Sequence, residues 1–521
     1  MDLVIKLSML VVFFGVMVGV GLYCRKHSTD VNGFVLGGRS VGPWLTAFAY
    51  GTSYFSAVVF VGYAGQFGWK YGIAATWAGI GNALLGSLMA WAVLGRRTRV
   101  MTQHLDSATM PQFFQERFGS KSLKLAASAV IFIFLIPYTA SLYNGLSRLF
   151  GMAFDIDYSV CVIVMAILTG VYVIAGGYMA TAINDFIQGL IMIGGIIAVI
   201  AAVLKGQGGF LEALNKLGQV SDPAVSETPG IFNSFFGPDP VNLLGVVLLT
   251  SLGTWGLPQM VQKFYAIKSE QAINKGMIIS TIFAAIVAGG CYFLGGFGRL
   301  FSDQIDIAAN GYDSIIPTML SGLPTVLIAI VVILVLSASM STLSSLVLAS
   351  SSTLTLDFIK GTVVKELDEK KQLLIMRGLI VVFIAISVVL AIVQYKSSVT
   401  FIAQLMGVSW GALAGAFLAP FLYGLYWKRT SKAAVWTSFV FSTVVMLANC
   451  VAKPLFPVIL QSPINAGAFC MLAGLVLVPV VSACTKAPDK QLVEHVFSCY
   501  DRKVLVSVKD SIGENDHDQE K

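Results

Sequence analysis

The stretch SLGTWGLPQ, residues 251–259, interrupts an apolar segment that is long enough to cross a membrane. It contains Gly253, Gly256 and Pro258, and a proline removes a backbone donor and clashes with the preceding turn of a helix. We therefore predict that the span 241–262 kinks or unwinds between Gly253 and Pro258. The carbonyl groups freed by this break need new partners, because hydrocarbon offers none.

A second stretch, AYGTSYFSA at residues 49–57, dilutes the helix-forming content of the span 44–68 in a similar way. Each interrupted span opens a group of five spans, which cover residues 44–204 and 241–426. Because five is odd, the second group starts from the opposite side of the membrane and is predicted to be inverted. Interrupted helices at matching positions of inverted repeats indicate a transporter site near the bilayer midplane. The alternative is that Gly and Pro serve only as packing and kink residues.

The whole chain has the composition of an integral membrane protein. Of its 521 residues, 56% are apolar and 12% are charged, whereas soluble domains carry about 25% charged residues. Apolar segments of roughly 20 residues recur, and we expect an all-α protein with about thirteen transmembrane helices within residues 1–484. The expected spans lie near 3–24, 44–68, 72–95, 125–150, 158–180, 185–204, 241–262, 276–298, 324–350, 378–395, 399–426, 433–452 and 466–484. The first lacks the basic start and the cleavage site of a signal peptide, so we interpret it as a retained span.

The basic residues predict the orientation. Of the 34 Lys and Arg residues, 26 fall in loops on the side of Arg25 or in the C-terminal tail, and 7 fall on or near the opposite face. By the positive-inside rule the N-terminus is outside and the tail, residues 485–521, is cytoplasmic. The end of the tail is predicted to be disordered. The net charge of +7 reflects this orientation, and no basic stripe indicates a nucleic-acid partner.

The cysteines and histidines give no sign of an enzyme. The 7 cysteines lie mostly inside spans without a CxxC pair, and the 4 histidines are scattered in cytoplasmic segments. These patterns favour neither zinc, disulfides nor a catalytic site. We expect no enzymatic activity and no organic cofactor.

The segment SASMSTLSSLVLASSSTLTLD, residues 337–357, continues an apolar run although 11 of its 21 side chains are Ser or Thr. The spacing i, i+3, i+4, i+7 puts Ala338, Ser341, Thr342 and Ser345 on one helical face. Hydroxyls and backbone carbonyls can ligate a hard monovalent cation without adding a buried charge, so a sodium site fits. The alternative is that the hydroxyls bond their own helix or a neighbouring one.

Asp185 begins the predicted span 185–204. A carboxylate at membrane depth costs about 2.5–3.5 kcal/mol on insertion scales, so such a residue is expected to face the bundle interior with a partner. The alternative is a helix-start residue that is favoured by the helix dipole.

Five blocks of the sequence resemble, in the same order, the sodium:solute symporter family and in particular its sodium/proline and sodium/pantothenate symporters. The blocks are LGGRSVGPWLTAFAYGTSYFSA (36–57), VYVIAGGYMATAINDFIQG (171–189), GLPQMVQKFYAIKS (256–269), MSTLSSLVLASSSTLTLD (340–357) and GLYWKR (424–429). The resemblance implies a LeuT-like core of 5+5 helices in inverted repeats, with one extra helix before it and two after it.

The resemblance also implies functional residues. A shared sodium site would use the backbone carbonyls of Thr52, Phe55 and Ala338 and the hydroxyls of Ser341 and Thr342. A second sodium site, which some relatives have, would use Asp185, Ser344 and Ser345. The expected substrate pocket comprises Tyr50, Tyr54, Tyr138, Thr254, Trp255, Pro258 and Gln259, whose aromatic members have interfacial anchoring or core packing as the alternative. Tyr54 departs from the sodium/proline symporters, which carry an Asp there.

We therefore expect a monomeric, multi-pass symporter of a bacterial-type cytoplasmic membrane, with the lipid bilayer around it, that couples inward sodium movement to uptake of a small organic solute. Proline or another small amino acid is the first expectation, and pantothenate or another monocarboxylate is the alternative. A proton-coupled carrier is disfavoured by the scarcity of buried acids and histidines. A channel or receptor is the remaining class, and no soluble signalling domain supports a sensor.

Overall fold

The computed structural model describes residues 2–25, 29–154, 157–360, 363–364, 367–397 and 402–500, and within these ranges the regular structure is helical. The end of the tail, from 501 onward, lies outside the described residues, and so does the prediction of disorder there. The helices are α1 Asp2–Cys24, α2 Val31–Leu36, α3 Pro43–Tyr54, α4 Ala64–Tyr71, α5 Thr76–Gly81, α6 Arg96–His104, α7 Met110–Phe118, α8 Lys121–Phe154, α9 Tyr158–Gly206, α10 Phe210–Gln219, α11 Pro240–Gly256, α12 Pro258–Ala266, α13 Glu270–Gly295, α14 Ile307–Asn310, α15 Ile315–Ser321, α16 Thr325–Thr353, α17 Glu369–Ser397, α18 Ile402–Tyr426, α19 Lys432–Val451, α20 Pro463–Cys484 and α21 Lys490–Phe497. Wider π-helical turns at Val58–Tyr63, Asn82–Met89, Trp91–Gly95 and Leu354–Ile359 extend some of them.

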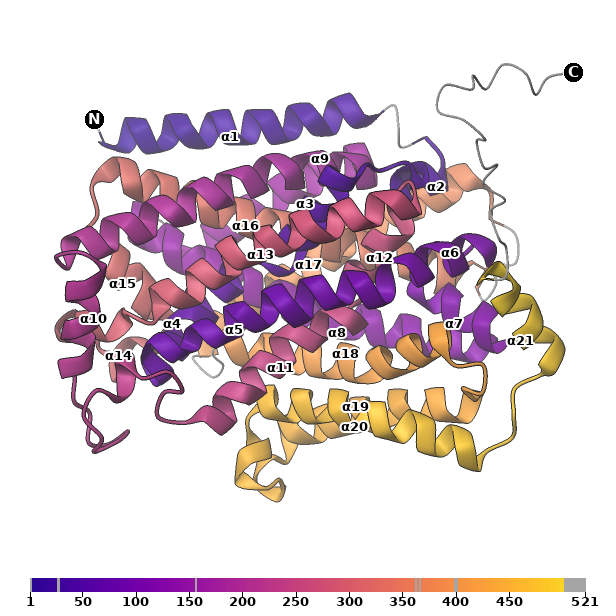
Figure 1. The fold of residues 1–521 in the computed structure, drawn as a ribbon. Coiled ribbons are helices and arrows are strands. Elements are labelled where there is room, and N and C mark those ends of the chain that lie inside the picture. The colour runs from indigo at the N-terminus through magenta and orange to yellow at the C-terminus, as the bar shows by residue number, and fades with distance from the viewer. Residues whose placement is uncertain are drawn as a thin grey trace, which may run out of the picture.

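The long helices run side by side along one direction, so the molecule has two ends (Figure 1). The N-terminus lies at the same end as α10 and α14, and α2, α6, α7 and α21 lie at the opposite end. This arrangement is that of a bundle whose helices cross a bilayer together.

Ten helical segments of the described residues are long and apolar enough to cross a membrane, or eleven when the bent pair α11 and α12 counts as one span. Two of them, Val58–His104 and Tyr158–Gly206, have 47 and 49 residues, about twice the length that a bilayer requires. They contain Gly72 and Gly177, whose φ angles of 60° and 54° are conformations that glycine adopts at little cost. Thirteen crossings would result if the chain turned back at each glycine, and that count stays a prediction.

Both predicted interruptions are confirmed as breaks in the helices. Helix α3 ends at Tyr54, and Phe55 is extended, with φ −88° and ψ 115°. Helix α11 ends at Gly256 and α12 begins at Pro258, with extended Leu257 between them and a bend of 46°. Proline suits the first turn of α12, where no amide donor is needed.

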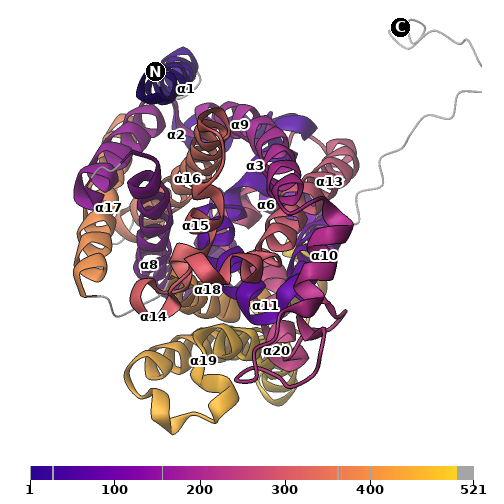
Figure 2. The same cartoon turned by 90° about the vertical axis from the view of Figure 1, so that its left-hand side faces the viewer.

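Helices α16 and α18 are the most enclosed of the candidate spans, whereas α1 is the least enclosed. Seen along the bundle in Figure 2, α1, α17 and α19 lie at the edges and α16 and α18 lie further inside. The peripheral helices expose large apolar side chains such as Val11 and Val389, as expected of lipid-facing surfaces. The hydroxyl-rich segment of α16 is therefore in the protein interior and not against lipid.

Candidate sodium and solute sites

The break in α3 meets the hydroxyl face of α16. The Ser341 hydroxyl lies 3.0 Å from the carbonyl oxygen of Thr52 and 3.1 Å from that of Ala338. The Thr342 hydroxyl oxygen lies 3.1 Å from the Thr52 carbonyl, 3.1 Å from the Ala338 carbonyl and 3.4 Å from the Phe55 carbonyl. All five residues are buried, so the five oxygens expected for the shared sodium site are gathered in one water-poor cluster.

The break explains why the carbonyls of Thr52 and Phe55 are available, whereas that of Ala338 lies within the continuous helix α16. The last four carbonyl groups of a helix have no amide partner within it, and Thr52 lies in the last turn of α3. Oxygens in an octahedral shell at about 2.4 Å from a cation are about 3.4 Å apart, taking the ligand distances of Ca²⁺, an ion close to Na⁺ in size. The spacings of 3.0–3.4 Å fit such a shell after a small expansion. The cluster is uncharged, and this chemistry suits a monovalent ion.

The residues expected for a second sodium site contact a lysine. Lys263 on α12 has a side chain that is 3% exposed, and its ammonium nitrogen lies 3.9 Å from a carboxylate oxygen of buried Asp185. The ammonium donates to the Ser345 hydroxyl at 3.0 Å, and the Ser345 hydroxyl lies 2.9 Å from that of Ser53. The Ser344 hydroxyl instead donates to the carbonyl of Ser341 at 2.9 Å.

Three of the expected substrate residues hold helices together. The Tyr50 hydroxyl donates to the Gly86 carbonyl at 2.8 Å, and the Thr254 hydroxyl donates to the same carbonyl at 2.9 Å. The Trp255 indole donates to the Leu85 carbonyl at 2.9 Å. These bonds tie both broken helices to the π-helical turn 82–89, so the three side chains serve at least as structural links.

Two other expected substrate residues keep polar atoms that are poorly paired. Among the described residues, neither amide atom of buried Gln259 has a hydrogen-bond partner, and the hydroxyl of buried Tyr138 has only weak side-chain contacts with Ser56 and Trp410. Gln259 follows Pro258 in the first turn of α12, beside the break. Since buried polar groups are usually paired, these atoms are the ones that a bound polar solute would satisfy. The side chain of Tyr54 lies outside the described residues.

Trp410 on α18 joins this group. Its ring packs edge-on against Tyr138, with ring centroids 5.8 Å apart. A Cβ atom added to Gly253 would lie 2.5 Å from the Trp410 ring, so the indole covers the helix break directly. The Trp410 indole nitrogen is also buried, and its polar contact among the described residues is a weak one with the Tyr138 hydroxyl. An aromatic wall with weakly paired polar atoms therefore lies at the broken helix α11.

A large cavity leads toward these elements from the end of the molecule that carries α10 and α14. It has a volume of about 1050 Å³ and is lined by Gln66 and Phe67 of α4, Asn242 and Val246 of α11, and Gln404 of α18, among others. Because α11 ends at one helix break, and α4 follows the other break after the π-helical turn 58–63, this cavity is a candidate entry path for a solute.

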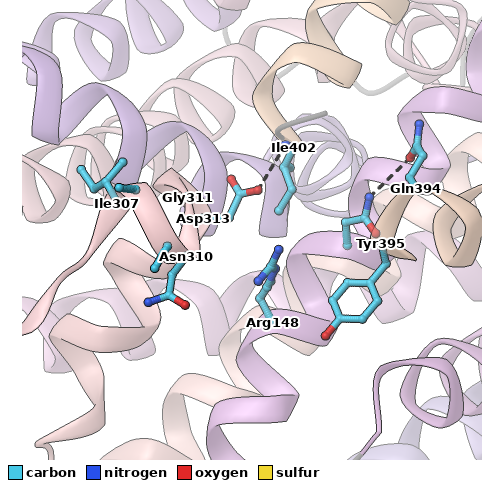
Figure 3. A pocket seen from close by; sticks show the side chains of 11 residues that line it. Arg148, Ile307, Asn310, Gly311, Asp313, Gln394, Tyr395 and Ile402 are labelled. Carbon is cyan, nitrogen blue, oxygen red and sulfur yellow. Dashed lines mark hydrogen bonds between the residues drawn. The ribbon is translucent and has the colours of Figure 1, made fainter. Parts of the chain in front are cut away.

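A second cavity of about 480 Å³ is lined by residues at the ends of α8, α17 and α18 and by α14 (Figure 3). Buried Asp313 accepts a hydrogen bond from the backbone amide of Ile402, the first residue of α18. Arg148 extends toward Asp313 in Figure 3. Burial raises the pKa of Asp313 to about 6, although the Ile402 amide and the Arg148 charge oppose the shift.

Comparison with known proteins places the chain in a family. The sodium:solute symporter family model matches residues 34–440. The sodium/proline symporters of Staphylococcus aureus strains JH9 and COL are each 30% identical to this chain over 450 residues, which is 84% of this chain and 84% of theirs. The chain belongs to the sodium:solute symporter family. This sodium:solute symporter is therefore a transporter and not an enzyme.

A solved structure also resembles the symporter. A Na⁺-coupled sialic acid symporter in a substrate-bound outward-open state superposes with a TM-score of 0.74, over 93% of this chain and 98% of that chain, at 16% sequence identity. At this identity the likeness concerns the fold alone. The expected all-helical fold of the LeuT type is confirmed.

Lys263 is the main residue whose role the sequence did not predict. Lys263 directly follows the predicted span 241–262, so it is one of the 26 basic residues that the charge analysis places on the cytoplasmic side. In the structure it is instead buried within α12. The sequence did contain one sign of this burial, because Pro258 can begin a new helix and Lys263 follows it within two turns. Trp410 was missed as well, since a tryptophan in an apolar span resembles any packing residue.

Proposed function

We propose that this symporter imports a small amino acid such as proline together with sodium. The observation that supports this best is the convergence of five buried oxygens from Thr52, Phe55, Ala338, Ser341 and Thr342 on one point between α3 and α16. A cation bound there would link the broken helix to α16. Each inward sodium would contribute about 2.3 kcal/mol per 100 mV of membrane potential, besides its own gradient.

The chemistry beside the second break supports a solute with a carboxylate and a small apolar body. The start of a helix attracts negative charge, and α12 starts at the break with the unpaired amide of Gln259 in its first turn. Tyr138 and Trp410 offer an aromatic surface whose polar atoms are only weakly paired. The relatives at 30% identity are sodium/proline symporters. Pantothenate and other monocarboxylates carry the same carboxylate and are the second candidate class.

Uptake into proteoliposomes tests the proposal. Labelled proline, other small amino acids, pantothenate and monocarboxylates are offered with an inward gradient of sodium or of potassium. We expect one small amino acid to accumulate with sodium only. Accumulation that follows a pH gradient and is independent of sodium would refute sodium coupling. Sodium-driven uptake of pantothenate alone would show that the solute belongs to the second candidate class and is not an amino acid.

The proposal includes the arrangement in the membrane. The N-terminus lies outside a bacterial-type cytoplasmic membrane, and the end with α2, α6, α7 and α21, which receives most of the basic residues, is cytoplasmic. The repeats are residues 44–204 and 241–426. We propose a monomer as the functional unit, because one chain supplies all five oxygens of the sodium site.

A further inference from the structure

Lys263 is a charged side chain in a place where membrane proteins rarely keep one. It lies on α12, and its ammonium group contacts three residues on two other helices: Asp185 and Tyr178 on α9, and Ser345 on α16. The nitrogen is 5.0 Å above the centre of the Tyr178 ring, a position that favours a cation. A carboxylate, a hydroxyl and an aromatic face thus surround one positive charge.

The same oxygens are those expected to hold a second sodium ion. Of the three residues of that site, Asp185 and Ser345 point their oxygens at the ammonium group, at 3.9 Å and 3.0 Å. A sodium ion in contact with this carboxylate would lie close to the ammonium, and two like charges in a buried site repel each other strongly. Charge repulsion therefore allows one cation at this position, and the Lys263 ammonium is that cation.

The ammonium is also connected to the first sodium site. Ser345 follows Ser341 by one helical turn on α16. Its hydroxyl lies 2.9 Å from that of Ser53, the neighbour of Thr52 in the broken helix. The Lys263 ammonium thus contacts α16 directly and is linked to α3 through the Ser345 hydroxyl, and these are the two helices that the sodium ion would join.

We propose that the Lys263 ammonium is a permanently attached cation in the second cation position, so that the symporter binds and carries one sodium ion per cycle. The number of ions carried per cycle rests on the proposed function. The number of sodium ions bound, however, can be measured without knowing the solute. In this chain the Asp185 carboxylate is neutralised by the Lys263 side chain, so no second ion is needed there.

The experiment counts sodium ions bound to the purified protein by equilibrium binding of radioactive sodium. We expect one ion on the wild type. Lys263→Met removes the ammonium and leaves Asp185 free to take an ion, so this variant should bind two. Lys263→Met combined with Asp185→Asn removes both charges and should bind one again. Lys268→Met, which removes an exposed lysine five positions along, is the matched control and should bind one.

Two sodium ions on the wild type would overturn the proposal, and so would a single ion on folded Lys263→Met. If Lys263→Met fails to fold because Asp185 is left unpaired, the wild type and the double variant still decide. One ion on each supports the proposal, and two ions on either refutes it. Failure of the proposed function has a different signature, which is the absence of sodium-driven uptake for every solute tested.

Discussion

Replacing Thr342 by valine is the sharpest test of the sodium site. Valine has almost the shape of threonine but no hydroxyl, so Thr342→Val removes one oxygen and leaves the packing of α16 nearly unchanged. That oxygen lies within 3.1–3.4 Å of all three carbonyl oxygens of the site. A hydrogen bond or similar polar contact to a charged group is worth about 1.5–3 kcal/mol.

At about 1.4 kcal/mol for each factor of ten, the loss corresponds to a rise of about 10-fold to 100-fold in the sodium concentration for half-maximal uptake. Replacing Ser341 and Thr342 together by alanine should raise this concentration at least as far. The assay is initial uptake of labelled solute into proteoliposomes over a series of sodium concentrations at constant ionic strength.

Ser352→Ala is the matched control, because the Ser352 hydroxyl bonds the Leu348 carbonyl of its own helix at 2.7 Å. This variant should keep the sodium dependence of the wild type. Thr342→Ser, which retains a hydroxyl, should lie close to the wild type as well. An unchanged sodium dependence in folded Thr342→Val would refute the assignment of this cluster as the sodium site.

Three further predictions concern other parts of the molecule. Tyr138→Phe removes a buried hydroxyl whose contacts with Ser56 and Trp410 are weak, so the unfolding temperature should change little while the KM for the solute rises about tenfold, the effect of one lost hydrogen bond. Gly253→Ala places a Cβ atom 2.5 Å from the Trp410 ring and should lower the maximal uptake rate of protein that still reaches the membrane. Burial raises the pKa of Asp313 to about 6, so the folded protein holds a proton there that the unfolded chain releases near pH 4. The resulting contribution to the free energy of unfolding is fully present below about pH 4 and is lost as the pH rises through 6. Relative to Asp313→Asn, the wild type should therefore lose up to about 3 kcal/mol of stability between pH 4 and pH 8, measured by unfolding in detergent, and parallel curves would contradict this.

The sequence predicts the helix breaks well because their causes are local. Proline at 258 and the glycines before it act through the backbone alone, and α11 ends where they lie. The hydroxyl face of α16 follows from helical periodicity in the same way. The pairing of that face with α3 could not be derived from spacing, because the two segments are about 290 positions apart, and it came from the family resemblance.

The local environment of a single side chain was not predictable from the sequence. Tyr50 and Thr254 were expected in the solute pocket, but both hydroxyls bond the Gly86 carbonyl. That bond depends on a π-helical turn, which has no clear sequence signature. Lys263 was assigned to a loop because charge is usually found in water, and only the packing of α9, α12 and α16 brings it beside Asp185.

If the oxygen cluster of α3 and α16 is the sodium site, as proposed, its hydroxyl protons have a consequence for the return step of the transport cycle. A carrier must recross the membrane without cargo, and bare carbonyl oxygens facing one another would make that form costly. Ser341 and Thr342 can each turn a hydroxyl proton toward the carbonyls of Thr52 and Ala338. The partial positive charge of each proton then takes the place of the absent ion between the oxygens. When a sodium ion binds, the two O–H bonds would rotate away from the carbonyls, so that the lone pairs of the hydroxyl oxygens face the ion. A cluster with alcohols in place of a carboxylate can therefore reset itself without borrowing a proton from solvent.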